Sequence, residues 1–329
     1  LLLFGCRKDK IGPQQSIEYV AEEKYYTVYI GCEGNFGSGN GSISVYDELS
    51  QEMSNNYFQQ VNNYLLGDVV QSIEEIDGNN YIVVNNSGKI EIVDTSNFVS
   101  NGNISGFVSP REIKRVKSNT AYVSDLYSNS IYVVDLVSKV ISSSIPVSGW
   151  TESIMVYDTI AMVSCPGSNV VYKINTNTHQ IVDSISTSES PMNLVFDKNN
   201  KLWVLCAGSW GTASSTLERI DVSAGVIEQT VPLNSTASKL CANSSADILY
   251  WIDGGVKQMS VDQVGVFNSI ISSGTGYYYG LGVHPQTDEI YITDAVDFVQ
   301  SGWLYRYNNS GGLIDSVNTG INPQAIYFR

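Results

Sequence analysis

The chain has 329 residues and a formal net charge of −15, with 43% hydrophobic and only 16% charged residues. A nucleic-acid binder needs a basic face to displace phosphate counterions, and the acidic balance together with the lack of any Lys/Arg cluster excludes that class. Valine, isoleucine and the 21 tyrosines favour strands, whereas the 28 glycines and the abundant Asn and Ser favour turns, so the composition predicts an all-β protein.

The N-terminus is an apolar run, Leu1–Phe4, followed by Gly5 and Cys6. An apolar run ending in a small residue and a cysteine resembles the end of a bacterial lipoprotein signal, which implies that Cys6 is lipidated and becomes the first mature residue. The alternative is an ordinary apolar N-terminus with an incidental cysteine. No stretch reaches the roughly 18 apolar residues of a membrane-spanning helix, so we expect the membrane to be reached through the lipid anchor only.

The remaining cysteines are isolated in the sequence. None of Cys32, Cys165, Cys206 and Cys241 forms a CxxC motif or a Cys/His cluster, so no zinc, iron–sulfur or haem site is expected. Pairing of Cys206 with Cys241 and burial of both as free thiols stay open as alternatives.

A repeat of four short apolar runs is clearest at residues 110–116, 121–125, 130–135 and 140–147. The residue that closes the third run recurs along the chain at intervals of 39 to 48 positions, namely at Asp47, Asp94, Asp135, Asn175, Asp221, Ser260 and Asn308. Four strands in about 40–45 residues is the period of a propeller blade.

The two ends of the chain complement each other. Residues 323–328 match the first strand of a unit, whereas the first unit begins directly with a second strand at residues 26–32. We therefore predict an all-β, seven-bladed β-propeller with four antiparallel strands per blade, closed by the C-terminal strand, which removes the open edges. The predicted organisation is a signal remnant and lipidated cysteine at 1–6, a linker at 7–24 and the propeller at 25–329.

Two stretches carry a family resemblance. Residues 122–147, with Tyr-Val-Ser-Asp and Ser-Ile-Tyr-Val-Val-Asp, are similar to the YVTN repeat of surface-layer and YncE-like propellers. Residues 290–295, 302–307 and 320–323 resemble the last blade of a Bacteroidetes family of extracytoplasmic propeller lipoproteins, some of which, the BtuG-type proteins, capture cobalamin beside an outer-membrane transporter. The resemblance implies an outer-membrane lipoprotein at the cell surface. It does not fix the ligand, because relatives with one fold can bind different molecules, and a corrinoid such as cobalamin, with such a transporter as partner, is our specific hypothesis.

The loops between second and third strands, and those between one blade and the next, emerge on the same face of a propeller. These loops contain aromatic residues among Gly, Ser and Asn, which is typical of a binding surface. The predicted ligand-binding residues are Asn35, Phe36, Asp125, Tyr127, Asn129, Trp150, Trp210, Tyr277, Tyr278, Tyr279, Asp294 and Phe298. The alternatives are that each ring packs under its own loop and that Asp125 and Asp294 cap their turns.

Catalytic motifs are lacking in the sequence. His179 and His284 lie at predicted turn or strand ends, where we expect them to be solvated, and neither belongs to a catalytic motif. We therefore predict a monomeric binding protein that is not an enzyme and has no cofactor or metal. The alternatives are a scaffold for a protein or a surface glycan and, less favoured because the five tryptophans do not recur at one blade position, a quinone- or metal-dependent enzyme.

Overall fold

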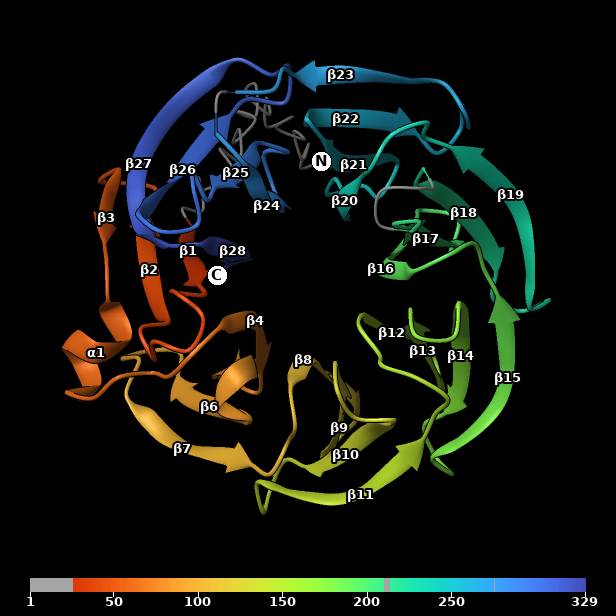
Figure 1. Ribbon diagram of the computed structural model, residues 1–329, viewed down its shortest axis with the longest axis horizontal. Helices are drawn as coiled ribbons and strands as arrows, with labels where there is room; N and C mark the ends of the chain where they lie inside the picture. Colours follow the sequence, from red (N-terminus) through yellow and green to blue (C-terminus); the bar gives the residue numbers. More distant parts are fainter. Residues whose placement is uncertain (1–25, 210–213, 275) are drawn as a thin grey trace, which may run out of the picture.

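The computed structural model describes residues 26–209, 214–274 and 276–329, and in these ranges seven four-stranded antiparallel sheets surround a central axis (Figure 1). Each sheet is one blade, which confirms the predicted seven-bladed β-propeller. Cys6 and the linker at 7–24 lie outside the described residues. No helix in the described ranges is long and apolar enough to cross a membrane.

Every blade runs from an inner strand at the channel to an outer strand at the rim, and the blades are numbered 1 to 7 around the ring. The inner strands are β28 (Pro323–Phe328), β4 (Val70–Ile76), β8 (Pro110–Lys117), β12 (Ile154–Tyr157), β16 (Pro191–Phe196), β20 (Ser238–Ala242) and β24 (Tyr278–Val283). The second strands are β1 (Thr27–Cys32), β5 (Asn79–Val84), β9 (Thr120–Asp125), β13 (Ile160–Cys165), β17 (Leu202–Cys206), β21 (Ile248–Asp253) and β25 (Ile290–Asp294).

The third strands are β2 (Ser42–Asp47), β6 (Lys89–Asp94), β10 (Ser130–Asp135), β14 (Val170–Asn175), β18 (Thr216–Asp221), β22 (Gly255–Ser260) and β26 (Ser301–Tyr307). The outer strands are β3 (Glu52–Ser54), β7 (Ser100–Ser105), β11 (Val140–Pro146), β15 (Gln180–Ser186), β19 (Val226–Pro232), β23 (Phe267–Ile271) and β27 (Leu313–Ile321). Two short helices, α1 (Tyr57–Asn62) and η1 (Asn85–Ser87), lie in connections.

Burial follows the position of a strand in its blade. The second strand β17 is buried along its whole length, because neighbouring blades pack against both of its faces, and its sequence is accordingly a continuous apolar run. The outer strand β11 is largely exposed and buries only Ile145 fully, so it tolerates three consecutive serines. The apolar core therefore lies between blades.

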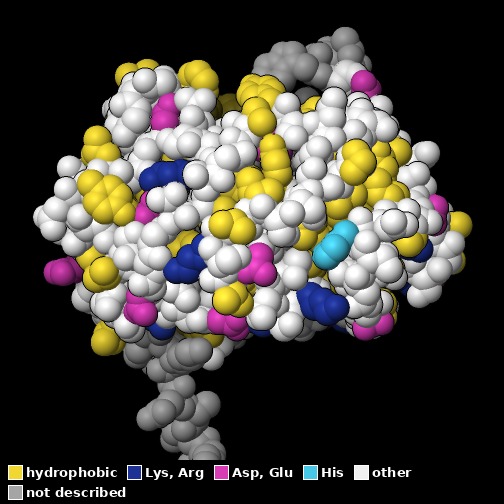
Figure 2. All heavy atoms as spheres, turned by 90° about the horizontal axis from the view of Figure 1, so that it is seen from below, with side chains coloured by type: hydrophobic (Ala, Val, Ile, Leu, Met, Phe, Trp, Pro, Cys, Tyr) yellow, Lys and Arg dark blue, Asp and Glu magenta, His cyan; other side chains and the backbone are white. Residues whose placement is uncertain are grey.

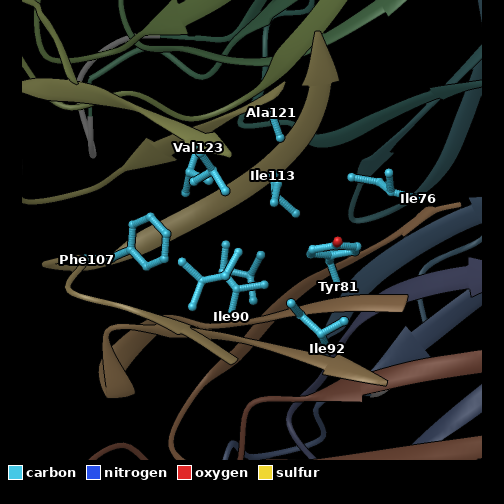
Figure 3. Packing of buried hydrophobic residues seen from close by; sticks show 11 residues of the cluster. Ile76, Tyr81, Ile90, Ile92, Phe107, Ile113, Ala121 and Val123 are labelled. Carbon is cyan, nitrogen blue, oxygen red and sulfur yellow. The ribbon is translucent and has the colours of Figure 1, made fainter. Parts of the chain in front are cut away.

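Figure 3 shows the core between blades 2 and 3. Ile90 and Ile92 on β6 pack with Tyr81 on β5 and face Ile113 on β8 and Val123 on β9, and all five side chains are buried. Because every blade needs both neighbours to bury its two faces, the ring has to close for the first and last blades to be stable.

Strand β28 closes the ring as predicted. It pairs antiparallel with β1, with Ile326 opposite Ile30 and Phe328 opposite Val28, so residues from the two ends of the sequence share blade 1 (Figure 1). A buried polar contact supports this closure. Glu48 accepts hydrogen bonds from the Tyr291 hydroxyl at 2.5 Å and from the Tyr26 backbone N–H at 2.8 Å.

His284 differs from the expectation of a solvated strand end. It is 2% exposed, its Nε2 lies 3.3 Å from Glu48, and its Nδ1 accepts the backbone N–H groups of Gln286 and Thr287. The reason is that blades 7 and 1 meet at this point, so the strand end is covered by the neighbouring blade. Burial opposes ionisation of Glu48, but the hydrogen bonds from His284 and Tyr291 outweigh it and hold the pKa of the carboxyl below its usual value.

The rim of the propeller is mostly uncharged. Figure 2 shows uncharged polar side chains and backbone over most of this side, with hydrophobic side chains singly and in patches and charged side chains scattered among them. This matches the low content of charged residues, and the serine- and asparagine-rich outer strands account for it.

Candidate ligand-binding site at the upper mouth of the channel

The connections between second and third strands and between successive blades lie on one face, which we call the upper face. They contact each other across blades. The Asn35 side-chain amide donates to the backbone oxygen of Phe298 at 3.3 Å, which joins the loops of blades 1 and 7. The Gly37 N–H donates to Asp68 at 2.8 Å, which joins blade 1 to the connection before blade 2. The upper face is therefore a connected surface.

Three of the predicted aromatic residues meet on this face. The ring of Phe298 lies 4.8 Å from that of Tyr277 and 5.2 Å from that of Tyr279, and the two tyrosine rings are 6.2 Å apart. Tyr277 is 54% exposed and Phe298 38%, so the cluster presents ring surface to solvent. We call these three residues the aromatic wall.

The other predicted residues are more scattered. Phe36 and Tyr127 are the most exposed aromatic residues in the described ranges, at 79% and 76%, and they lie on blades 1 and 3, respectively. Asn129 is exposed beside Tyr127. Trp150 is half-buried against Gly167, where any Cβ would clash with its ring. Trp210 lies outside the described residues.

Tyr278 does not join the aromatic wall. Its ring packs among the partly buried residues of blade 7, 6.2 Å from the ring of Tyr305, and its hydroxyl lies 3.4 Å from that of Tyr307. Successive side chains of a strand point to opposite sides, so three consecutive tyrosines cannot share one surface.

Both predicted aspartates end a second strand, Asp125 that of blade 3 and Asp294 that of blade 7, and they bind the backbone of the adjoining loops. Asp125 is fully buried; its Oδ2 accepts the N–H groups of Val108 and Ser109, and its Oδ1 accepts those of Tyr127 and Ser128. Asp294 is 4% exposed and its Oδ1 accepts the N–H groups of Tyr277 and Val296. Their carboxylates hold the loops in place, which is the capping role that the sequence left open.

A ring of β-bulges surrounds the upper end of the channel. In six of the seven described blades the register between inner and second strand shifts near the start of the inner strand, and the extra residue there is unpaired. A bulge re-aims one side chain out of the regular alternation. The residues at these positions are Gln324, Gln71, Arg111, Met192, Lys239 and Tyr279, and Glu152 precedes the inner strand of blade 4.

Polar members of this ring bind one another. The Arg111 Nε donates to both oxygens of Glu152, at 2.9 and 2.8 Å, and its Nη1 donates to Gln71 at 2.6 Å. The Gln324 amide donates to the backbone oxygen of Gln71 at 2.5 Å. We call the group Glu33, Gln71, Arg111, Glu152, Lys239, Tyr279 and Gln324 the mouth network.

Lys239 connects distant parts of the network. Its backbone has φ +54°, a conformation unusual for a lysine, and its ammonium hydrogen-bonds the side-chain oxygen of Gln324 on blade 1. The ammonium also lies 5.8 Å from the ring centre of Tyr279 on blade 7. The Tyr279 hydroxyl donates to both oxygens of Glu33, at 3.0 and 3.1 Å. Tyr279 therefore belongs to both the aromatic wall and the mouth network.

Burial shifts the ionisation of these groups. Burial raises the pKa of Glu33, although Lys239 and the Tyr279 hydroxyl oppose the shift. Burial also lowers the pKa of Lys239, against the attraction of Glu33. Both shifts disfavour the charged form, as expected where water is partly excluded.

A polar cavity follows the network along the channel. Its volume is about 230 Å³, and its lining includes Ser72, Glu112, Ser153, Asn193 and Leu240. In the sequence each of these residues directly follows a bulge residue or, for Ser153, Glu152. Burial raises the pKa of Glu112 to about 7, and its carboxyl accepts the backbone N–H of Ile154 at 2.9 Å. The mouth network therefore separates the upper face from this cavity.

Sequence reasoning found the aromatic wall but missed the charged residues of the network. A signal was present, because Arg111 and Gln324 each follow a proline at the start of an inner strand, in Ser109-Pro110-Arg111 and Asn322-Pro323-Gln324. Aligning the inner strands on this position would have shown that long polar side chains recur there in several blades.

The remaining nucleophilic and metal-binding side chains form no second site. The four described cysteines are free, so Cys206 and Cys241 are not paired in this structure. In the described ranges no three His, Cys, Asp or Glu side chains are grouped to hold a metal. The face opposite the upper face, which we call the lower face, carries the turns between third and outer strands and between inner and second strands. His179 lies in such a turn, between β14 and β15, where its Nδ1 hydrogen-bonds the Tyr122 hydroxyl at 2.8 Å.

Solved structures with the same fold are distant in sequence. A quinoprotein alcohol dehydrogenase-like protein of Bacteroides thetaiotaomicron matches with a TM-score of 0.74 at 14% identity, covering 92% of this chain and 77% of the other. The periplasmic gluconolactonase of Pseudomonas aeruginosa matches with a TM-score of 0.71 at 11% identity, covering 93% and 99%. Hydrazine synthase of Kuenenia stuttgartiensis matches with 0.67 at 17% identity, covering 78% and 88%.

At such identities these likenesses show the fold alone. No curated protein matches the chain. One family model, described as a domain of unknown function, DUF5074, matches residues 26–328, which is nearly the whole propeller. The chain therefore belongs to the DUF5074 family.

Proposed function

We propose that this propeller captures a small molecule on its upper face, at the mouth of the channel. The observation that carries the proposal is the position of Tyr279, whose ring completes the exposed aromatic wall and whose hydroxyl binds Glu33 of the mouth network. A rigid apolar surface beside a few fixed polar groups is the usual composition of a small-molecule site.

Binding without turnover fits the distribution of catalytic side chains. Both histidines lie toward the lower face, opposite the aromatic wall. The Nδ1 of His179 hydrogen-bonds Tyr122, and the two ring nitrogens of His284 contact Glu48 and backbone N–H groups. Glu152 is held by Arg111. Among the described residues, the upper face thus offers contacts for recognition and holds neither of the two histidines as a general base.

For the ligand we propose a corrinoid such as cobalamin, delivered to an outer-membrane transporter by a protein anchored through Cys6. The likeness of the last blade to cobalamin-capturing lipoproteins supports this choice. A wide macrocycle fringed with amides also suits the upper face, where the aromatic wall adjoins amide side chains such as Asn35, and where Phe36 and Tyr127 add exposed rings farther out.

Calorimetric titration with cyanocobalamin tests the proposal. We expect one-to-one binding, and at least a tenfold loss of affinity in the double variant Tyr277→Ala/Phe298→Ala, because the wall supplies most of the apolar contact. Leu313→Ala, an exposed apolar residue of the outer strand β27, is the matched control and should bind like the wild type.

The outcomes separate the parts of the proposal. Absence of heat and of complex would remove the corrinoid. Tight binding that the double variant leaves unchanged would place the ligand away from the aromatic wall.

A further inference from the structure

The mouth network has an even balance of charge. Arg111 and Lys239 are positive and Glu33 and Glu152 negative. Arg111 and Glu152 form an ion pair with each other, with side chains only 18% and 10% exposed. In the described part of the chain neither Lys239 nor Glu33 forms an ion pair. The charges of Arg111 and Glu152 thus neutralise each other, whereas Lys239 and Glu33 can still pair with groups of a ligand.

Lys239 and Glu33 present complementary hydrogen-bonding groups. An ammonium has three N–H donors, and in the described structure Lys239 uses one of them, on the side-chain oxygen of Gln324. An ionised carboxylate accepts about four hydrogen bonds, and Glu33 accepts from the Tyr279 hydroxyl. Both groups contact the same side chain, Tyr279: the Lys239 ammonium lies over its ring, and the Glu33 carboxylate accepts from its hydroxyl.

We propose that Lys239 and Glu33 form a subsite for an uncharged primary amide group of the ligand. The amide oxygen accepts from the Lys239 ammonium, and the amide N–H donates to the Glu33 carboxylate. This inference rests on the proposed function, because it places the amide beside the aromatic wall at the same mouth.

The balance of charge excludes the charged alternatives. A carboxylate would bind Lys239 but face Glu33, and an ammonium would do the reverse. Either would leave an excess charge among partly buried groups, which is costly where water cannot compensate it. An amide is both donor and acceptor, and it leaves the net charge of Arg111, Lys239, Glu33 and Glu152 at zero.

The network already holds an amide in this way. The Gln324 carboxamide accepts from Lys239 with its oxygen and donates to the backbone oxygen of Gln71 with its nitrogen. Below the network, Asn193 and the serines at 72 and 153 line the cavity together with Glu112 and the ion pair of Lys114 with Glu74. The precedent for an amide is therefore the Gln324 carboxamide within the network itself.

Three aromatic probes of similar shape test the proposal: benzamide, benzoate and benzylamine at pH 6, where Glu112 below the network is mostly uncharged. Their ring suits the aromatic wall, and they differ only in charge and hydrogen bonding. Ligand-observed NMR titration should show wild-type protein binding benzamide at least tenfold more tightly than the two charged probes.

Variants of the two residues give opposite shifts. Lys239→Met leaves a net negative site and should move the preference toward benzylamine, whereas Glu33→Gln leaves a net positive site and should move it toward benzoate. Lys198→Met, whose lysine pairs with Asp262 in a turn on the lower face, is the control and should keep the wild-type order. Thermal melting of each variant confirms that it is folded.

The results distinguish the subsite from the function. If all three probes bind equally, or if both variants shift the preference in the same direction, the amide subsite is wrong although the aromatic wall binds ligands. If no probe binds and cyanocobalamin does not bind either, the proposed function fails and the subsite with it.

Discussion

The carboxyl group of Glu112 lies in the channel just below the mouth network. Burial raises its pKa to about 7, and the negative charges of Glu152 and Glu74 add to the effect, whereas the Ile154 N–H and Lys114 oppose it. Because its ordinary pKa is 4.5, the folded state binds this proton more tightly than the unfolded state does. Stability from this group is complete below pH 4.5 and is lost as the pH rises through about 7.

We therefore expect Glu112→Gln to stabilise the protein at pH 8, by up to roughly 3 kcal/mol, because the amide stays neutral and can still accept from Ile154. The gain should disappear at pH 4.5. Urea unfolding at both values measures it, with Glu52→Gln on the exposed outer strand β3 as the control, which should change stability by less than about 0.5 kcal/mol. A gain that is the same at both values would contradict the assigned ionisation.

At the scale of the elements, closure of the ring depends on six residues. Strand β28 is the inner strand of blade 1 and contributes Ile326 and Phe328 to the core between blades 7 and 1. Without it β1 loses its inner partner, and buried residues such as Val28 and Ile30 become accessible to water.

A chain that ends at Asn322 should lose the cooperative unfolding transition of the wild type, or melt at least 15 °C lower, because the blades on both sides of the gap lose their packing. Differential scanning calorimetry and hydrogen exchange of β1 test this. Arg329→Ala keeps the backbone pair with Thr27 and should change stability by at most about 1 kcal/mol. A truncated chain that melts like the wild type would show that closure by β28 is dispensable.

The elements were largely predictable from the sequence, and the site only in part. Blade number, inner strands and closure follow from alternating apolar runs and a regular spacing, which local patterns record. The bulges do not, because one unpaired residue such as Lys239 looks like any other residue of an irregular strand start. The same limit explains why Tyr278 was predicted at the binding surface although it packs inside blade 7. A register shift at Tyr279 decides which tyrosines face the mouth. His284 was misjudged because its burial arises from a neighbouring blade distant in sequence.

The whole molecule is acidic, with 33 Asp and Glu against 18 Lys and Arg. Such a surface is repelled by anionic lipid, so electrostatic attraction would not hold it on a membrane. If the protein is membrane-bound, the acyl anchor proposed at Cys6 has to supply the attachment.

Cell fractionation tests the anchor. We expect the wild type in the membrane fraction even after washing with 1 M salt, and Cys6→Ser in the soluble fraction, with radiolabelled palmitate incorporated only by the wild type. Cys165→Ser, at a buried thiol, is the control and should remain membrane-bound and labelled. Release of the wild type by salt, or labelling of the Cys6→Ser variant, would refute attachment through this cysteine.

The ring of bulges has a consequence for how this family can diversify. Each bulged blade contributes one residue to the mouth. This residue has no partner residue in the neighbouring strand, and its side chain lies outside the apolar layers between blades. Substitutions at these positions can therefore change what the mouth recognises while the packing that holds the blades together stays the same. Relatives with one scaffold should thus differ in ligand chiefly at these few positions. Because Gln71, Arg111, Lys239 and Gln324 bind one another, their residues should change together.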